Sequence, residues 1–174
     1  MNDELVVRRV HGAEAMALCG ALADVLLDCV EGGASVSFMP PLPREKVLGF
    51  WRRVAEDVAR GARALLVAEL DGRVVGTAHL VLDLPDNQPH RADVVKMLVR
   101  RSARRRGVAM RLLEAVDEAA RAERRSVLVL DTVTGSDADR LYERAGWQRV
   151  GSIPNYALMP TGVPCAATFF HKQL

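Results

Sequence analysis

The chain has 174 residues, which is long enough for one domain with a substantial hydrophobic core. Its apolar content of 49% and charged content of 26% are ordinary for a soluble globular protein. A formal net charge of only +2 argues against a general nucleic-acid binder, because such proteins are usually basic over a whole face. Cys19, Cys29 and Cys165 are widely spaced without a C-x-x-C pair, so neither a disulfide framework nor a zinc site is indicated.

Location and domain organisation follow from simple features of the sequence. The start, Met1-Asn2-Asp3-Glu4, is acidic and lacks a signal-peptide pattern, and no apolar run approaches the length of a membrane span. The cysteine usage fits a reducing compartment. We therefore expect a cytoplasmic protein with neither membrane nor nucleic acid as a partner. Since no repeat or linker divides the chain, we expect a single domain over residues 1–174.

The first half of the chain is expected to contain helices and a hairpin. Residues 31–43 are rich in glycine and proline, which interrupt a helix, so they predict a loop. Asp71-Gly72 separates two segments rich in β-branched residues and predicts a tight hairpin turn. The polar stretch 84–90 predicts a second loop. In chain order we expect strand 5–7, helix 13–30, helix 44–60, strand 64–70 and strand 74–82.

In the second half, strands and helices alternate. An apolar strand leads into a basic turn and then into a helix with one apolar face. That face comprises Ala109, Leu112, Leu113, Val116 and Ala120. Ser136 predicts the N-cap of a further short helix, which ends at Gly146. The expected strands are 93–99, 126–131, 147–153 and 167–172. This order indicates an α/β layered domain around a mixed sheet.

The basic turn, Arg104-Arg105-Arg106-Gly107, lies where a helix begins. Three arginines are unfavourable there, because the helix dipole and the free N–H groups favour negative charge. A bound anion such as a phosphate resolves both problems. The alternative interpretation is a solvated basic turn beside a helix that Ser102 caps.

Two motifs identify a known family. Arg104-x-x-Gly107-x-Ala109 opens a helix, and Leu141-Tyr142-x-x-x-Gly146-Trp147 follows after that helix and one strand. In this order the motifs resemble the GNAT N-acetyltransferase superfamily, and the resemblance covers nearly the whole chain. It implies a mixed, mostly antiparallel twisted sheet with helices on both faces. It also implies acetyl-CoA as the co-substrate, no metal, and direct transfer in a ternary complex.

A narrower resemblance concerns the acceptor. Residues 32–39, Leu130-Asp131-Thr132 and 149–156 are similar to tabtoxin-resistance acetyltransferases, which acetylate a β-lactam-containing amino acid toxin. The chain departs from that group at Asp93, where the group has a glutamate, and in a turn with less glycine. The resemblance implies a small, amino-acid-like amine as the acceptor, such as a toxin or an antibiotic.

The family resemblance also implies which residues hold acetyl-CoA. The backbone of Met97, Leu98 and Val99 would pair with the pantetheine arm as an added strand would, although their side chains are expected in the core. The pyrophosphate would bind the turn at Arg104, Arg105, Arg106, Gly107, Val108 and Ala109, whose N–H groups can form a nest. Ser136 and Tyr142 complete the expected cofactor site.

The resemblance implies that Tyr142 is a general acid that protonates the departing thiolate. By itself this tyrosine would be interpreted as a core aromatic with a hydrogen-bonded hydroxyl. Asp93 and Asp131 are candidates to bind the acceptor amine and remove its proton. The alternatives are that Asp131 is a turn residue and that Asp93 pairs with Arg91 or Arg100. The histidines are scattered and suggest no relay.

The glycine-rich segment 32–39 is expected to cover the acceptor pocket, with Ser35 and Phe38 as the substrate contacts. The alternative is an ordinary connection between helices. Two other functions stay open: a protein or peptide N-acetyltransferase, and an acetyl-CoA-binding sensor without catalysis. A homodimer is one of the assemblies that the resemblance allows.

Overall fold

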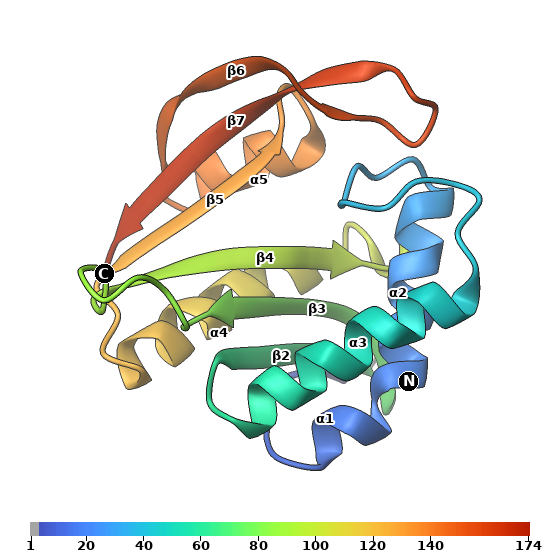
Figure 1. The fold of residues 1–174 in the computed structure, drawn as a ribbon, viewed down its shortest axis with the longest axis vertical. Helices are drawn as coiled ribbons and strands as arrows, with labels where there is room; N and C mark the ends of the chain where they lie inside the picture. The colour runs from blue at the N-terminus through green and yellow to red at the C-terminus, as the bar shows by residue number, and fades with distance from the viewer. Residues whose placement is uncertain (1–3) are drawn as a thin grey trace.

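The computed structural model describes residues 4–174, so the acidic start at Met1–Asp3 lies outside the described residues. Its centre is a seven-stranded sheet in the order β1-β2-β3-β4-β5-β7-β6 (Figure 1). All neighbouring strands are antiparallel except β4 and β5, which confirms the mixed, mostly antiparallel sheet. The strands are β1 Leu5–Val10, β2 Arg63–Leu70, β3 Arg73–Val81, β4 Arg91–Val99, β5 Val127–Val133, β6 Gln148–Leu158 and β7 Pro164–Gln173.

Helices cover both faces of the sheet, as expected (Figure 1). The helix predicted over 13–30 is wrong in one respect: the chain forms two helices that are separated at Leu18. The helices are α1 Glu14–Ala17, α2 Cys19–Glu31, α3 Arg44–Ala59, α4 Val108–Ala122 and α5 Asp137–Arg144, with a short 3-10 helix, η1, at Arg101–Ala103. In the described part of the chain, no helix is long and apolar enough to cross a membrane.

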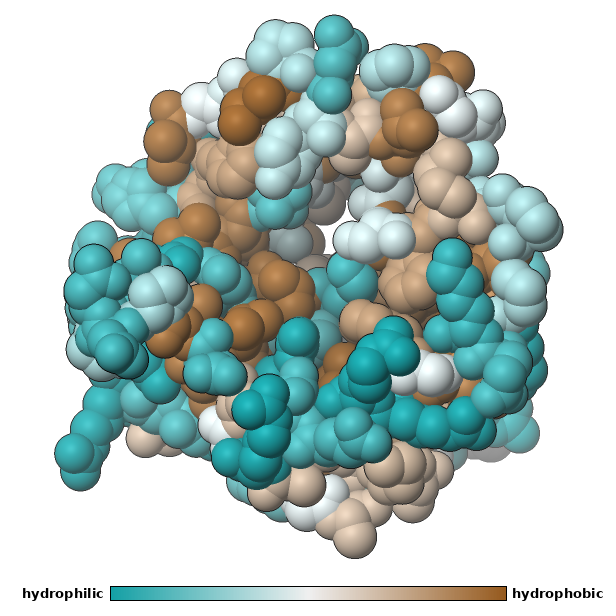
Figure 2. All heavy atoms as spheres, viewed as in Figure 1, coloured by the Kyte–Doolittle hydropathy of each residue, from teal (hydrophilic) through white to brown (hydrophobic). Residues whose placement is uncertain are grey.

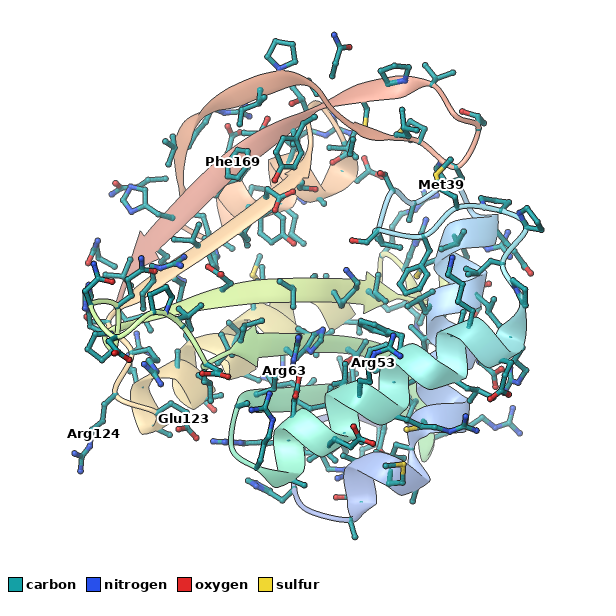
Figure 3. The ribbon with its side chains drawn as sticks, in the orientation of Figure 1. Met39, Arg53, Arg63, Glu123, Arg124 and Phe169 are labelled. Carbon is teal, nitrogen blue, oxygen red and sulfur yellow. The ribbon has the colours of Figure 1, made fainter. Side chains whose placement is uncertain are left out.

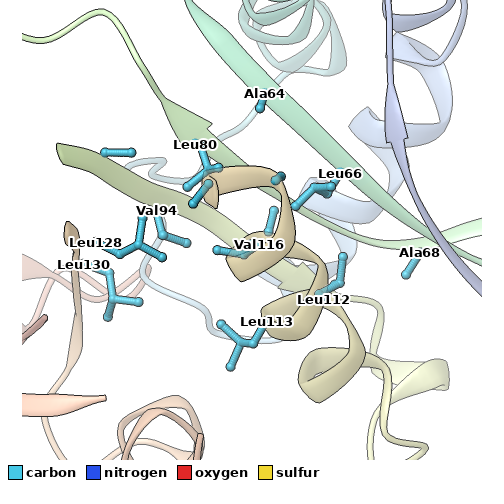
Figure 4. Close-up of a cluster of buried hydrophobic side chains, with 14 of the residues drawn as sticks. Ala64, Leu66, Ala68, Leu80, Val94, Leu112, Leu113, Val116, Leu128 and Leu130 are labelled. Carbon is cyan, nitrogen blue, oxygen red and sulfur yellow. The ribbon is translucent and has the colours of Figure 1, made fainter. Parts of the chain in front are cut away.

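The core consists of two clusters of buried side chains on opposite faces of the sheet. On one face α4 packs Leu112 and Val116 against Leu66, Leu80 and other strand residues (Figure 4). On the other face α2 and α3 pack against β2 and β3, with Trp51 fully buried. Burial of this apolar surface fixes the helices to the sheet.

β4 changes the face that its side chains present. It pairs with β3 in one register up to Val95 and in a shifted register from Leu98, and Lys96 between them has a φ of 52°. Val94 and Leu98 would share a face in a regular strand, because side chains alternate with period two. Here Val94 belongs to the cluster under α4 and Leu98 to the cluster under α2 and α3. A bulge at Lys96 therefore reverses the two faces of β4.

The sheet opens between β4 and β5. These parallel strands pair only where Arg91–Asp93 lies beside Val127–Val129, although β4 continues to Val99 and β5 to Val133. Figure 1 shows the two strands diverging. Figure 2 shows the molecule hollowed between them, with polar and apolar residues around the opening.

Several strand ends lie beyond the predicted ones. Asp131 was expected to close its strand, but it lies inside β5 and pairs with Phe169 of β7. β6 likewise extends to Leu158 instead of 153. Acidic and hydroxyl side chains favour turns, which is why the strand was predicted to end early. Pairing with β7 keeps Asp131 and Thr132 extended in spite of this preference.

Candidate active site

The arginine turn joins the end of β4 to α4. Arg104, Arg105 and Arg106 are exposed, and Gly107, with a left-handed φ of 79°, is the N-cap of α4. No side chain caps this helix and its first turn has no acid. Ser102 lies in η1, so the alternative in which Ser102 caps the helix is wrong. An uncapped helix N-terminus beside guanidinium groups is an arrangement that suits an anion such as a pyrophosphate.

The strand edge beside the opening is formed by Met97, Leu98 and Val99. Their other edge pairs with β3, where Leu98 lies opposite Thr77 and Val99 opposite Gly76. Within residues 4–174, no strand pairs with the edge that faces β5, and such an edge can take up an extended ligand. The side chain of Leu98 is buried and its two neighbours are partly buried, as predicted for core residues.

Tyr142 lies on α5 with its ring in the core. Its ring centroid is 5.9 Å from that of Trp147 and 5.8 Å from that of Phe170, and only 5% of the residue is exposed. Burial, and then the charge of Asp131, raise the pKa of Tyr142, so the phenol is protonated at neutral pH. No hydrogen bond within residues 4–174 uses its hydroxyl. The ring is therefore that of a core aromatic, but the hydrogen-bonded hydroxyl of that interpretation is absent from the described part of the chain, and the protonated hydroxyl also suits a general acid.

Asp131 projects from the face of β5 opposite to Leu128 and Leu130, which are buried under α4. It is open to solvent, and it forms no ion pair within the described residues. Partial burial of its carboxyl group, and then the negative charge of Asp93, raise the pKa of Asp131, whereas Lys96 lowers it. An unpaired carboxylate with a raised pKa is a good candidate for a base.

Asp93 is in a different environment. Its carboxylate forms a salt bridge with Arg91, whose guanidinium also donates to Oε1 of Gln88 at 2.9 Å. The alternative expected for this residue, pairing with Arg91, is therefore present. Because its charge is compensated, Asp93 is better suited to adjusting the pKa of Asp131 than to accepting a proton.

Lys96, at the bulge of β4, was not among the expected site residues. Its Nζ donates to Oγ of Ser37 at 3.0 Å and lies 5.8 Å from the centroid of the Phe50 ring. Burial, and then the charge of Arg63, lower the pKa of Lys96, while Asp131 raises it. The only sequence signal was a lysine within the apolar run 94–99.

The loop between α2 and α3 reaches across to the β6–β7 hairpin. Oγ of Ser35 donates to the carbonyl oxygen of Leu158 at 2.7 Å, and the ring of Phe38 packs edge-on against Phe50, with the centroids 5.3 Å apart. Figure 3 shows Met39 of this loop beneath the tip of the hairpin. The loop thus connects two sides of the hollow, which an ordinary connection between helices would not do.

The other nucleophilic and titratable groups nearby do not form a relay. His79 is completely buried, and burial, followed by the charges of Arg63 and Lys96, lowers its pKa well below the usual value. Burial also raises the pKa of the thiols of Cys19 and Cys29. Within residues 4–174, no group of three or more histidine, cysteine and acidic residues is placed to hold a metal ion.

A pocket of about 280 Å³ lies beside the hollow, between α3 and the start of β2 (Figure 3 labels Arg53 and Arg63 there). It shares the ring of Phe50 with the surroundings of Lys96. Arg63 in this pocket is paired with Asp57 at 2.7 Å.

Fold and site together define an α/β domain with an uncapped, arginine-flanked helix N-terminus at α4 and with β4 and β5 diverging beside Asp93 and Asp131. The family profile of the Acetyltransferase (GNAT) family matches residues 34–147. The chain belongs to this family, which confirms the family predicted from the two motifs. A stretch of 112 residues is 37% identical to an uncharacterized N-acetyltransferase in the hisH-hisA intergenic region of Azospirillum brasilense. That stretch is 63% of this chain and 65% of the relative, slightly less than two thirds of its length.

Solved structures share the fold over nearly the full chain. A ribosomal-protein-alanine N-acetyltransferase from Brucella melitensis has a TM-score of 0.81 at 24% identity, and the match covers 97% of this chain and 99% of that one. The yncA protein of Salmonella typhimurium, solved with its cofactor acetyl-CoA, has a TM-score of 0.79 at 19% identity. The match covers 98% of this chain and 94% of that one. These identities support the fold alone and leave the acceptor undefined.

Proposed function

We propose that this protein transfers the acetyl group of acetyl-CoA to the amine of a small, amino-acid-like molecule, in a ternary complex without an acyl-enzyme. The observation that carries the proposal is the unpaired Asp131 beside the opening between β4 and β5, electrostatically coupled to the buried Tyr142. Asp131 lies on β5 beyond its last pair with β4, and the uncapped start of α4 follows the end of β4. A toxin or an antibiotic of the kind acetylated by tabtoxin-resistance enzymes is the proposed acceptor.

The residues of the turn and of β4 fit acetyl-CoA. The N–H groups at Gly107, Val108 and Ala109 and the arginines before them would hold the pyrophosphate, because they place several donors and positive charges at one helix end. The backbone of 97–99 would hold the pantetheine arm, with Ser136 near its end. Acetyl-CoA supplies the activated thioester carbonyl on which the transfer depends.

The chain's own groups would handle the protons. Asp131 would hold the acceptor ammonium and take a proton from it, because its carboxylate is unpaired and its raised pKa makes it a stronger base. Asp93 would support this role by its charge. The C–N bond of the amide then forms as the C–S bond breaks, and Tyr142 would give its proton to the leaving thiolate. The proton that the attacking nitrogen still has to lose would restore the Tyr142 hydroxyl.

The loop between α2 and α3 favours a small acceptor. It is fastened to β6 through Ser35 and to β4 through Ser37, so it covers one side of the hollow. Ser35, whose hydroxyl is used in this contact, and Phe38 stay predicted substrate contacts. A peptide would need this cover to open.

The test is consumption of acetyl-CoA by the purified protein, followed through the released thiol, with a panel of amino acids, β-lactam amino acids, aminoglycosides, polyamines and peptides. We expect turnover of at least one small amine, with intersecting double-reciprocal plots. Parallel plots would point to an acyl-enzyme instead. Binding of acetyl-CoA without turnover of any panel member would favour the sensor, and turnover of peptides alone would favour the peptide acetyltransferase.

A further inference from the structure

The charges around the hollow are not all balanced. Four charged side chains from β2, β4 and β5 influence one another there: Arg63, Asp93, Lys96 and Asp131. Two of them have partners, since Arg63 pairs with Asp57 and Asp93 with Arg91. This leaves one cation and one anion to be explained.

Lys96 and Asp131 are the two charges without a counter-ion. Neither forms an ion pair within 4.0 Å in the described part of the chain, and the one hydrogen bond of Lys96 goes to the neutral hydroxyl of Ser37. Each nevertheless favours the charged form of the other. The two groups lie on β4 and β5 beyond the last pair of these strands, where the strands diverge, and they attract each other without forming an ion pair. A ligand that carries both charges could contact both.

The hydrogen bond to Ser37 needs a donor at position 96 but no charge. The neighbouring residues Val94, Val95, Met97 and Leu98 are apolar, and burial disfavours the ammonium form of Lys96. Contact with the ring of Phe50 offsets only part of the cost of burying the ammonium group, because exposed cation–π contacts are weak. The bulge is what turns this side chain toward the loop and the hollow instead of leaving it in regular alternation.

We infer that Lys96 determines specificity by binding an anionic group, a carboxylate, on the acceptor whose amine lies at Asp131. The protein would thus select zwitterionic amino acids and discriminate against acceptors that carry only positive charge, such as polyamines and aminoglycosides. This inference deepens the proposed function and rests on it.

The test compares each amino acid that the enzyme acetylates with its decarboxylated amine, for example L-methionine with 3-(methylthio)propylamine. With saturating acetyl-CoA, we expect kcat/KM of the wild-type protein to be about 10- to 100-fold higher for the amino acid than for the amine. A hydrogen bond to a charged group typically contributes a factor of this size. Lys96→Met should abolish this preference by raising KM for the amino acid while kcat is kept, because the contact is the same in ground and transition states. At a pH above the pKa of Asp131 in both proteins, the decarboxylated amine should be used as well as before.

Three further variants separate recognition from folding. Lys96→Arg keeps a cation and should keep most of the preference. Ser37→Ala removes the bond between Lys96 and the loop without removing charge, and should keep the preference too. Lys46→Met makes the same change at an exposed lysine of α3 and should change nothing.

The outcomes are distinct. Equal loss with both members of a pair in Lys96→Met would mean a structural role and would overturn the inference. So would a wild-type protein that uses decarboxylated amines or 1,4-diaminobutane as well as amino acids, although the proposed acetyltransferase would stand. Calorimetric binding of acetyl-CoA without turnover of any acceptor would overturn the proposed function and this inference with it.

Discussion

The two sides of the hollow are built in different ways. The side proposed for acetyl-CoA is one continuous segment, in which arginines, a left-handed glycine and a helix start follow one another from Arg104 to Ala109. The proposed acceptor side is assembled from β4, β5, α5 and the loop after α2, which contribute Lys96, Asp131, Tyr142 and Ser37. The first side gathers charges of one sign, as an anion requires, whereas the second carries a cation and an anion that are not paired with each other. Binding and chemistry should therefore be separable by mutation.

The largest effect should come from Asp131→Asn. The amide has the same shape but cannot take a proton, so we expect kcat to fall by about 1,000-fold. Calorimetry should give an unchanged Kd for acetyl-CoA, because Asp131 belongs to the acceptor side. Asp93→Asn is the matched control and should cost far less, since Arg91 already compensates Asp93. Full turnover by Asp131→Asn at neutral pH would disprove its role as the base.

Tyr142→Phe should lower kcat by about 100-fold, because the proton donor for the thiolate is lost. The ring contacts with Trp147 and Phe170 remain, and the hydroxyl has no partner within residues 4–174. The melting temperature should therefore hardly change. If acetyl-CoA affinity falls and kcat is kept, Tyr142 positions the cofactor and is not the acid.

Gly107→Ala tests the cofactor side alone. A Cβ at Gly107 would meet no atom within 4 Å, but the φ of 79° is strained for alanine by about 1–2 kcal/mol. We expect the turn to relax out of this conformation and Kd for acetyl-CoA to rise by about tenfold. A strain energy of about 1.4 kcal/mol corresponds to this factor. Gly72→Ala, in the hairpin between β2 and β3, has the same open surroundings and a φ of 74°. It should lower the melting temperature similarly without changing Kd; equal effects of both on Kd would argue against the anion site.

The smallest effect should be a shift in pH dependence. The active form of Asp131 is the carboxylate, so kcat/KM should rise as the pH increases through its pKa, which burial and Asp93 raise. Asp93→Asn removes a negative charge and should move this limb of the pH profile, the rise in kcat/KM, to lower pH. Lys96→Met removes a positive charge and should move it to higher pH. Shifts of the same sign in both variants would show that the limb belongs to another group, such as the acceptor amine.

Features encoded by neighbouring residues were predicted well. Asp71-Gly72 was expected to form a tight turn, and both residues have positive φ, as that hairpin requires. Ser136 caps α5 by accepting from the N–H of Asp139 at 3.2 Å. The basic turn and the α4 stripe follow from spacing and the helical period in the same way.

Features that depend on distant partners were not predicted. Asp131 was taken for a strand end because acids favour turns, and only β7 shows that it continues as a strand. Lys96 was overlooked because its bulge depends on the register between β3 and β4. The pairing of Asp93 with Arg91 stayed one of several alternatives, since a sequence does not reveal which charges meet.

The sequence by itself determined the family, the order of elements and the basic turn at the start of α4, because each depends on residues that are close in the chain. Tertiary structure decided the surroundings of the proposed acceptor side. There β4 separates from β5, and β4 reverses its faces at Lys96. The loop after α2 is held by Ser35 and Ser37, so that single residues from four elements come together. Their charges and pKa values depend on burial and on neighbours far along the chain. Those neighbours are defined only when the sheet and its helices have packed.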